Sequence, residues 1–189
     1  MTPQQAGAIL AEFTASDALR RHAVMVSVAM EAYAGRFGGD ADTWAAVGLI
    51  HDFDYETYPD LADHCVRGAE ILRDRGADEA IIRAMLSHND ATGVRRDSDL
   101  EKALYAVDEL CGFIHACVLV RPSQSIADLT AQSVKKKLKD KRFAAACNRE
   151  DIRRGAEQLG VDFDEHLAFV IDALRAKKDR WDGPPMLPG

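Results

Sequence analysis

The chain has 189 residues, of which 47% are hydrophobic and 29% are charged, a composition typical of a soluble globular domain that buries its own core. The formal net charge of -7 argues against nucleic-acid and anionic-membrane partners, because an acidic surface repels both. None of the apolar runs approaches the ~20 residues that span a bilayer. Glu12 also interrupts the N-terminal region where a signal peptide would be apolar.

The cysteines at positions 65, 111, 117 and 147 form no CxxC pair. This spacing indicates reduced, buried thiols rather than a disulfide framework. We therefore expect a cytoplasmic protein, and the sequence leaves its oligomeric state open.

Helical periodicity and capping residues run through the whole chain, and no stretch alternates as a strand would. The expected helices cover residues 4–13, 17–34, 41–51, 63–75, 78–88, 99–120, 133–141, 149–159 and 163–177. Residues 54–60 are acidic and aromatic and contain Pro59, which predicts a loop in a position where catalytic side chains are common.

The fold class predicted from this pattern is all-α: one compact domain of several helices over residues 1–180. The segment 181–189 is rich in glycine and proline and is expected to be disordered.

The longest expected helix opens with a capping box formed by Ser98 and Glu101. Asp108 falls within the apolar stripe of this helix. An unpaired buried carboxylate is costly, so Asp108 needs a partner.

Six histidine and aspartate residues lie near apolar faces or helix ends on five expected helices: His22, His51, Asp52, His64, His88 and Asp108. Imidazole and carboxylate groups together suit first-row divalent ions. Six protein ligands exceed what one tetrahedral ion requires, so the set predicts two neighbouring ions.

The order of His22, the His51-Asp52 pair and Asp108 resembles the HD superfamily of metal-dependent phosphohydrolases, over about residues 16–150. This resemblance implies a helical fold with the metal site between helices. His64 and His88 are similar to the extra histidines of dinuclear members, some of which hydrolyse nucleotides.

On this resemblance His22, His51 and Asp108 would hold one ion. His64 and His88 would hold the other, and Asp52 would bridge both. The ions would be divalent Fe, Mn, Mg, Co or Ni.

The function implied is that of a phosphomonoesterase or phosphodiesterase, in which metal-activated water attacks a small anionic phosphate ester or nucleotide. Asp52 is expected at the catalytic centre, and Asp54, Glu56 or a water on the metal could move protons. The motif continues as Phe53-Asp54, where dinuclear members commonly carry Ile-Gly, which leaves the general acid or base open.

Two other functions remain open: a mixed-valence di-iron oxygenase of the same fold, and a sensor that binds a metal or nucleotide without catalysis. Arg121 and the lysine-rich segment 135–141 favour phosphate handling, because a phosphate site needs cations. The same segment can also be a solvated helix face. His115 is expected in the core or beside the site, and His166 on the surface.

Overall fold

The computed structural model describes residues 1–184, 187 and 188. Its helices are α1 (Pro3–Phe13), α2 (Asp17–Phe37), α3 (Ala41–Ile50), α4 (Val66–Asp74), α5 (Glu79–His88), α6 (Asp99–Leu119), α7 (Ala131–Leu138), α8 (Arg149–Leu159) and α9 (Phe163–Ala176), with short 3-10 helices η1 (Asp90–Thr92) and η2 (Lys178–Arg180). The described residues contain no strand, so the all-α prediction is confirmed.

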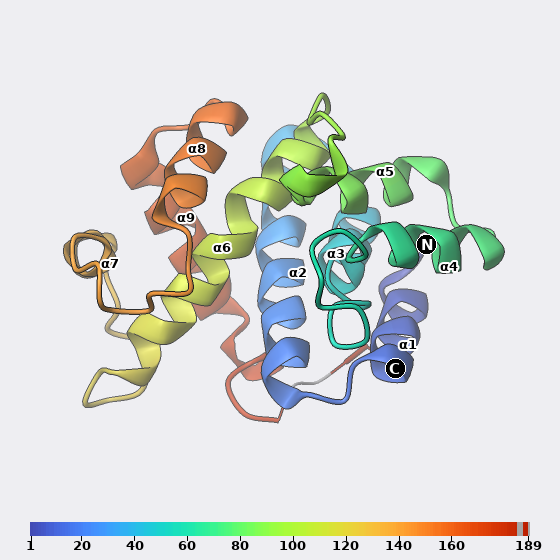
Figure 1. Ribbon diagram of the computed structural model, residues 1–189. Helices are drawn as coiled ribbons and strands as arrows, with labels where there is room; N and C mark the ends of the chain where they lie inside the picture. The colour runs from blue at the N-terminus through green and yellow to red at the C-terminus, as the bar shows by residue number, and fades with distance from the viewer. Residues whose placement is uncertain (185–186, 189) are drawn as a thin grey trace.

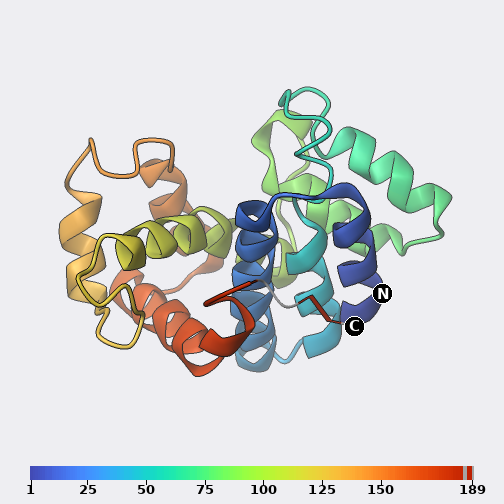
Figure 2. The same ribbon diagram turned by 90° about the horizontal axis from the view of Figure 1, so that it is seen from below.

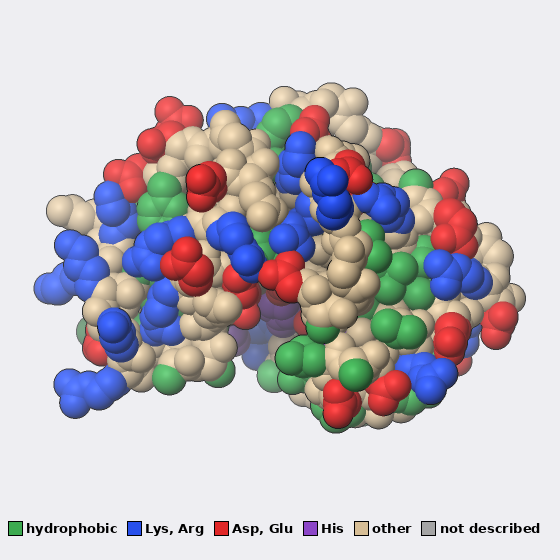
Figure 3. Space-filling model, turned by 45° about the horizontal axis from the view of Figure 1, so that its top comes forward, with side chains coloured by type: hydrophobic (Ala, Val, Ile, Leu, Met, Phe, Trp, Pro, Cys, Tyr) green, Lys and Arg blue, Asp and Glu red, His purple; other side chains and the backbone are tan. Residues whose placement is uncertain are grey.

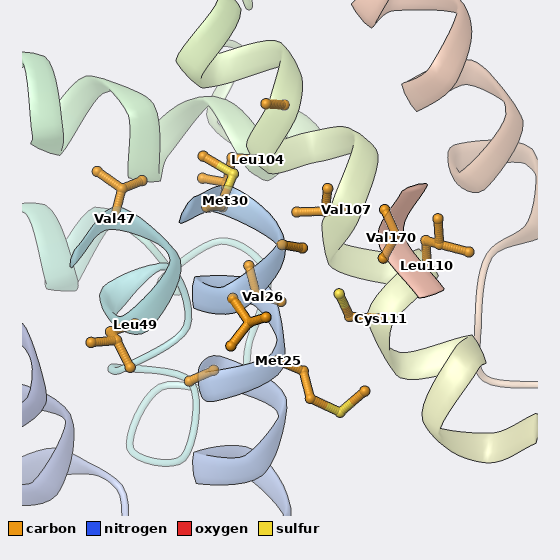
Figure 4. Packing of buried hydrophobic residues seen from close by; sticks show 14 of the residues in the cluster. Met25, Val26, Met30, Val47, Leu49, Leu104, Val107, Leu110, Cys111 and Val170 are labelled. Carbon is orange, nitrogen blue, oxygen red and sulfur yellow. The ribbon is translucent and has the colours of Figure 1, made fainter. Parts of the chain in front are cut away.

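The two longest helices, α2 and α6, cross at the centre of the molecule (Figure 1). Helices α1, α3, α4 and α5 lie on one side of this crossing, and α7, α8 and α9 lie on the other (Figures 1 and 2). Apolar side chains from α2 and α6, among them Met30 and Leu104, are fully buried between them (Figure 4). Among the described residues, none of the helices has the length and apolarity to cross a bilayer.

Two glycines let helices approach closely on either side of the site described below. A Cβ atom at Gly48 of α3 would lie 2.6 Å from the Cα atom of Ser27 on α2, and one at Gly155 of α8 would lie 2.6 Å from the Cα atom of Ala106 on α6. Because no real side chain fits such a gap, glycine fixes how α3 packs on α2 and how α8 packs on α6.

The structure corrects the predicted start of the fourth helix. The sequence pattern placed His64 inside a helix over 63–75, but α4 begins at Val66. Cys65 before it has a φ of 67°, a conformation that is strained for a residue with a side chain. The carboxylate of Asp54 accepts hydrogen bonds from the backbone N–H groups of Cys65 and Gly68, which holds His64 in a turn that faces the centre of the molecule.

Trp181, the first residue of the segment expected to be disordered, is instead buried in the core. Its indole N–H donates to the carbonyl of Leu174, and Arg21 donates to the carbonyls of Trp181 and Gly183. Pro188 lies against Gly7 of α1. The predicted disorder of residues 185, 186 and 189 lies outside the described residues.

Candidate metal centre

Four of the six predicted ligands lie in one cluster where α2, α3 and α6 meet: His22, His51, Asp52 and Asp108. The Nε2 atom of His22 lies 2.9 Å from Oδ1 of Asp108 and 3.2 Å from Nε2 of His51. His51 Nε2 lies 3.4 Å from Oδ1 of Asp108. Asp108 therefore has the partners that its position in the apolar stripe of α6 required.

Asp52 faces two groups of histidines with its two carboxylate oxygens. Oδ2 lies 3.4 Å from Nε2 of His51 and 4.0 Å from Nε2 of His22. Oδ1 lies 3.1 Å from Nε2 of His64 and 3.1 Å from Nε2 of His88. All six predicted ligands thus meet around one carboxylate.

Three of the histidines are oriented by their other ring nitrogen. His51 Nδ1 donates to the carbonyl of Gly48 at 2.8 Å, and His88 Nδ1 donates to the carbonyl of Met85 at 2.6 Å. His64 Nδ1 lies 3.0 Å from Oδ1 of Asp54. A hydrogen bond at Nδ1 leaves Nε2 with its lone pair, so each of these rings presents a ligand atom to the cluster.

The electrostatics of the cluster favour positive charge. Burial acts to lower the pKa of His51, but the carboxylates of Asp52 and Asp108 outweigh it and raise this pKa to about 10. The pKa of His64 is raised to about 11 in the same way, because Asp52 and Asp54 outweigh burial. A divalent ion would compete with these protons for the same nitrogen atoms.

The donor set fits divalent metal ions. Two ligand atoms that are about 2.1 Å from one ion and at right angles lie about 3 Å apart, close to the separations of 2.9 and 3.2 Å that His22 makes with Asp108 and His51. His22, His51, Asp108 and Oδ2 of Asp52 would hold one ion. His64, His88 and Oδ1 of Asp52 would hold a second.

The cluster lies at the bottom of an open cleft of about 720 Å³. Figure 3 shows histidine side chains in this hollow, with acidic and basic side chains around its rim. One wall carries Tyr55 and Leu61, whose exposed fractions are 38% and 62%. The opposite wall belongs to α6 and α8, and both walls leave the cluster accessible to a small substrate.

Asp54 and Glu56, which were expected to move protons, do not line this cleft. Asp54 is fully buried and uses its carboxylate to orient His64 and the turn at Cys65. Glu56 accepts hydrogen bonds from the backbone N–H groups of Ala15 and Ser16. These contacts give Asp54 a positioning role and make Glu56 part of the connection that leads into α2.

The cations expected to handle phosphate also lie elsewhere. None of the residues from Lys135 to Lys141 lines the cleft. Lys135 of α7 pairs with Asp164 of α9 at 2.7 Å, and Arg121 pairs with Asp128 at 2.6 Å. Neither group therefore supports phosphate binding at the cluster, because neither Arg121 nor the lysine-rich segment lines its cleft.

The two remaining histidines also have defined positions. His166 is fully buried, which corrects its predicted place on the surface. The hydroxyl of Tyr33 lies 2.6 Å from its Nδ1, and its Nε2 lies 3.0 Å from the carbonyl of Ala106. His115 is half-buried, packs edge-on against Trp181 and does not line the cleft.

The wall opposite Tyr55 was not expected from the sequence; it contains Tyr105, Glu109, Asn148, Glu150, Asp151 and Arg154. Tyr105 and Glu109 could have been found, because the first is one helical turn from Asp108 and the second follows it directly. The residues on α8 carry no comparable sequence signal, since only the packing of α8 on α6 brings them to the cluster.

Glu109 lies in this wall beside Asp108 and accepts a hydrogen bond from the backbone N–H of Asn148. Burial raises its pKa to about 7, and the charge of Asp108 adds to the effect. The wall thus contains a carboxyl group close to the candidate ligands.

The family model described as the HD domain matches residues 19–112. No curated protein and no solved structure matches the chain. The matched segment runs from α2 into α6 and contains all six residues of the cluster, but it ends before α8. The family match and the convergence of these six residues agree, and the chain is a member of the HD-domain superfamily, whose helical fold is associated with metal-dependent hydrolases.

Proposed function

We propose that this protein is a metal-dependent phosphohydrolase that acts on a small phosphate ester. The observation that carries the proposal is the position of Asp52, whose two carboxylate oxygens face separate groups of histidines at the bottom of an open cleft. This arrangement supports two divalent ions that share one carboxylate. The HD-domain match supports hydrolysis as the reaction class.

Divalent ions at this point would supply Lewis-acid chemistry: they activate water and neutralise the charge that develops on the phosphoryl oxygens. The protein contributes the geometry. His51, His64 and His88 are oriented by hydrogen bonds at Nδ1, so little reorganisation is needed when ions and substrate bind. The surrounding apolar core holds His51, which is fully buried, in a fixed position.

The test is to load the purified protein with Mn, Fe, Co, Ni or Mg and to assay phosphomonoesters, phosphodiesters and nucleotides. We expect turnover that Asp52→Ala abolishes and that Asp63→Ala retains, because Asp63 is exposed and does not line the cleft. Absence of turnover with every metal would overturn the proposal. Oxygen consumption by the iron-loaded protein would instead identify the oxygenase chemistry that the same ligands allow.

A further inference from the structure

Arg154 of α8 is the one Lys or Arg among the described residues that line the cleft. It lies outside the segment that matches the HD domain. Because Gly155 packs against Ala106, the neighbouring Arg154 contacts Tyr105, which lies one helical turn from Asp108. Arg154 therefore belongs to the part of the cleft that this chain adds to the family's metal cluster.

The guanidinium of Arg154 is fixed on one edge. Its Nε donates to the hydroxyl of Tyr105 at 2.7 Å. Its Nη2 donates to Oδ1 of Asp151 at 2.6 Å and also contacts Asp90 and the Tyr105 hydroxyl. A planar guanidinium held in this way loses little conformational freedom when it forms a further hydrogen bond.

The other edge of the guanidinium is available. Within the described part of the chain, Nη1 of Arg154 donates to no hydrogen-bond acceptor, and 38% of the side chain is exposed. An oriented donor at the wall of a cleft is suited to an oxygen atom of a ligand.

The charges around Arg154 restrict what this ligand can be. Glu109, Glu150 and Asp151 line the same wall, and Arg154 is already paired with Asp151 and Asp90. A second anionic group on the substrate would face this excess of carboxylates, which is unfavourable. A hydroxyl group both donates and accepts, so it can bond to the carboxylates and to Nη1 at once.

We propose that Arg154 is a specificity-determining residue whose Nη1 donates to an oxygen of the substrate's leaving group, and that this leaving group is an uncharged, hydroxyl-rich moiety such as a polyol or sugar. The inference rests on the proposed function, because it requires that the phosphate binds to the metal ions while the leaving group contacts the wall formed by α6 and α8. It narrows the substrate to singly phosphorylated molecules and disfavours those with several phosphates.

The test measures binding, because phosphonates carry a C–P bond that a phosphohydrolase does not cleave. Isothermal titration of the Mn-loaded protein would compare 2,3-dihydroxypropylphosphonate with propylphosphonate, which lacks the hydroxyls, and with 2-carboxyethylphosphonate, which carries a second anion. We expect the dihydroxypropyl compound to bind at least tenfold more tightly than either of the others. Equal affinities for the three compounds, or tighter binding of 2-carboxyethylphosphonate, would overturn the inference in the wild-type protein alone.

Two variants test whether Arg154 is the source of the preference for the dihydroxypropyl compound. Arg154→Lys keeps a positive charge beside Asp90 and Asp151 but removes the Nη1 donor, so the preference for the dihydroxypropyl compound should fall to less than threefold while propylphosphonate affinity stays the same. Arg153→Gln is the matched control, since Arg153 is the exposed neighbour on α8 and does not line the cleft. A preference that survives Arg154→Lys would show that Arg154 is not its source.

The outcomes separate this inference from the proposed function. If none of the three phosphonates binds to the metal-loaded wild-type protein, the placement of phosphate at the cluster is wrong. If all three bind with similar affinity, the placement of phosphate at the cluster is supported and the proposed role of Arg154 is wrong.

Discussion

Oδ1 of Asp54 lies 3.0 Å from Nδ1 of His64, on the side of the imidazole ring away from Asp52. A carboxylate at this position accepts a hydrogen bond from Nδ1–H and leaves the Nε2 lone pair for a metal ion. Asp54 lies two residues after the His51-Asp52 pair, yet it is fully buried. It therefore orients the ligand His64 and does not face the cleft itself.

We predict that Asp54→Asn weakens binding of the ion held by His64 and His88 by about 10- to 100-fold. The amide oxygen can still accept from Cys65 and Gly68, but the amide nitrogen would then face Nδ1 and favour the tautomer with a proton on Nε2. Metal titration should show one weakened ion and one unchanged ion. Two unchanged affinities would contradict the positioning role of Asp54.

Asp52→Ala should abolish binding of both ions, because each carboxylate oxygen serves a different group of histidines. Circular dichroism should show nearly unchanged helical content, since Asp52 lies in a turn after α3 and is partly exposed. Elemental analysis of protein purified without chelator is the measurement. Full metal occupancy in this variant would show that Asp52 is not a bridge.

Unequal metal loss is expected from the other ligands. His64→Ala and His88→Ala should each remove about one metal equivalent, and His22→Ala and Asp108→Ala should affect the other. The reason is that the two groups share only Asp52. If the wild-type protein binds a single ion and the His64 and His88 variants retain it, the centre is mononuclear.

Replacement of Lys135, Lys136 and Lys139 by Gln should leave KM and its dependence on salt unchanged. Lys135 and Lys136 lie on α7 and Lys139 directly follows its last residue, and all three are outside the cleft. Surface substitutions of this kind change the free energy of unfolding by no more than about 0.5 kcal/mol. Steady-state kinetics at several salt concentrations provide the check. A tenfold rise in KM with an unchanged melting temperature would implicate α7 in substrate capture.

His166 should make the protein less stable as the pH falls below about 6.5. Burial lowers its pKa from 6.5 to about 4 in the folded state, with a further contribution from Arg36. The unfolded chain therefore binds more protons between these pH values, and stability falls from pH 6.5 towards pH 4 by up to about 3 kcal/mol. Well above pH 6.5 both states are neutral at this residue and the contribution is constant.

Urea denaturation at a series of pH values would measure this dependence. His166→Gln is a suitable comparison, because an amide can bond to Tyr33 and to the Ala106 carbonyl without titrating. The free-energy difference between wild type and variant should change over this pH range. Parallel curves would show that His166 does not titrate on unfolding.

Local patterns in the sequence predict the helices, apart from the start of α4, and they identify the six clustered residues. The helices were predictable because local signals encode them: the capping box at Ser98 and Glu101 and the cap at Asn148 are both present. Asp108 could be recognised because a carboxylate in an apolar stripe requires a partner, and the partners are His22 and His51.

Packing between distant helices determines which side chains share the cleft. Proximity in sequence suggested Asp54 and Glu56 as proton carriers, but hydrogen bonds to backbone and to His64 hold them away from it. Arg154 is 46 residues from Asp108 along the chain, and it reaches the cleft only because α8 packs on α6 at Gly155. Contacts between distant helices depend on the shape of the packed core, which local periodicity does not encode.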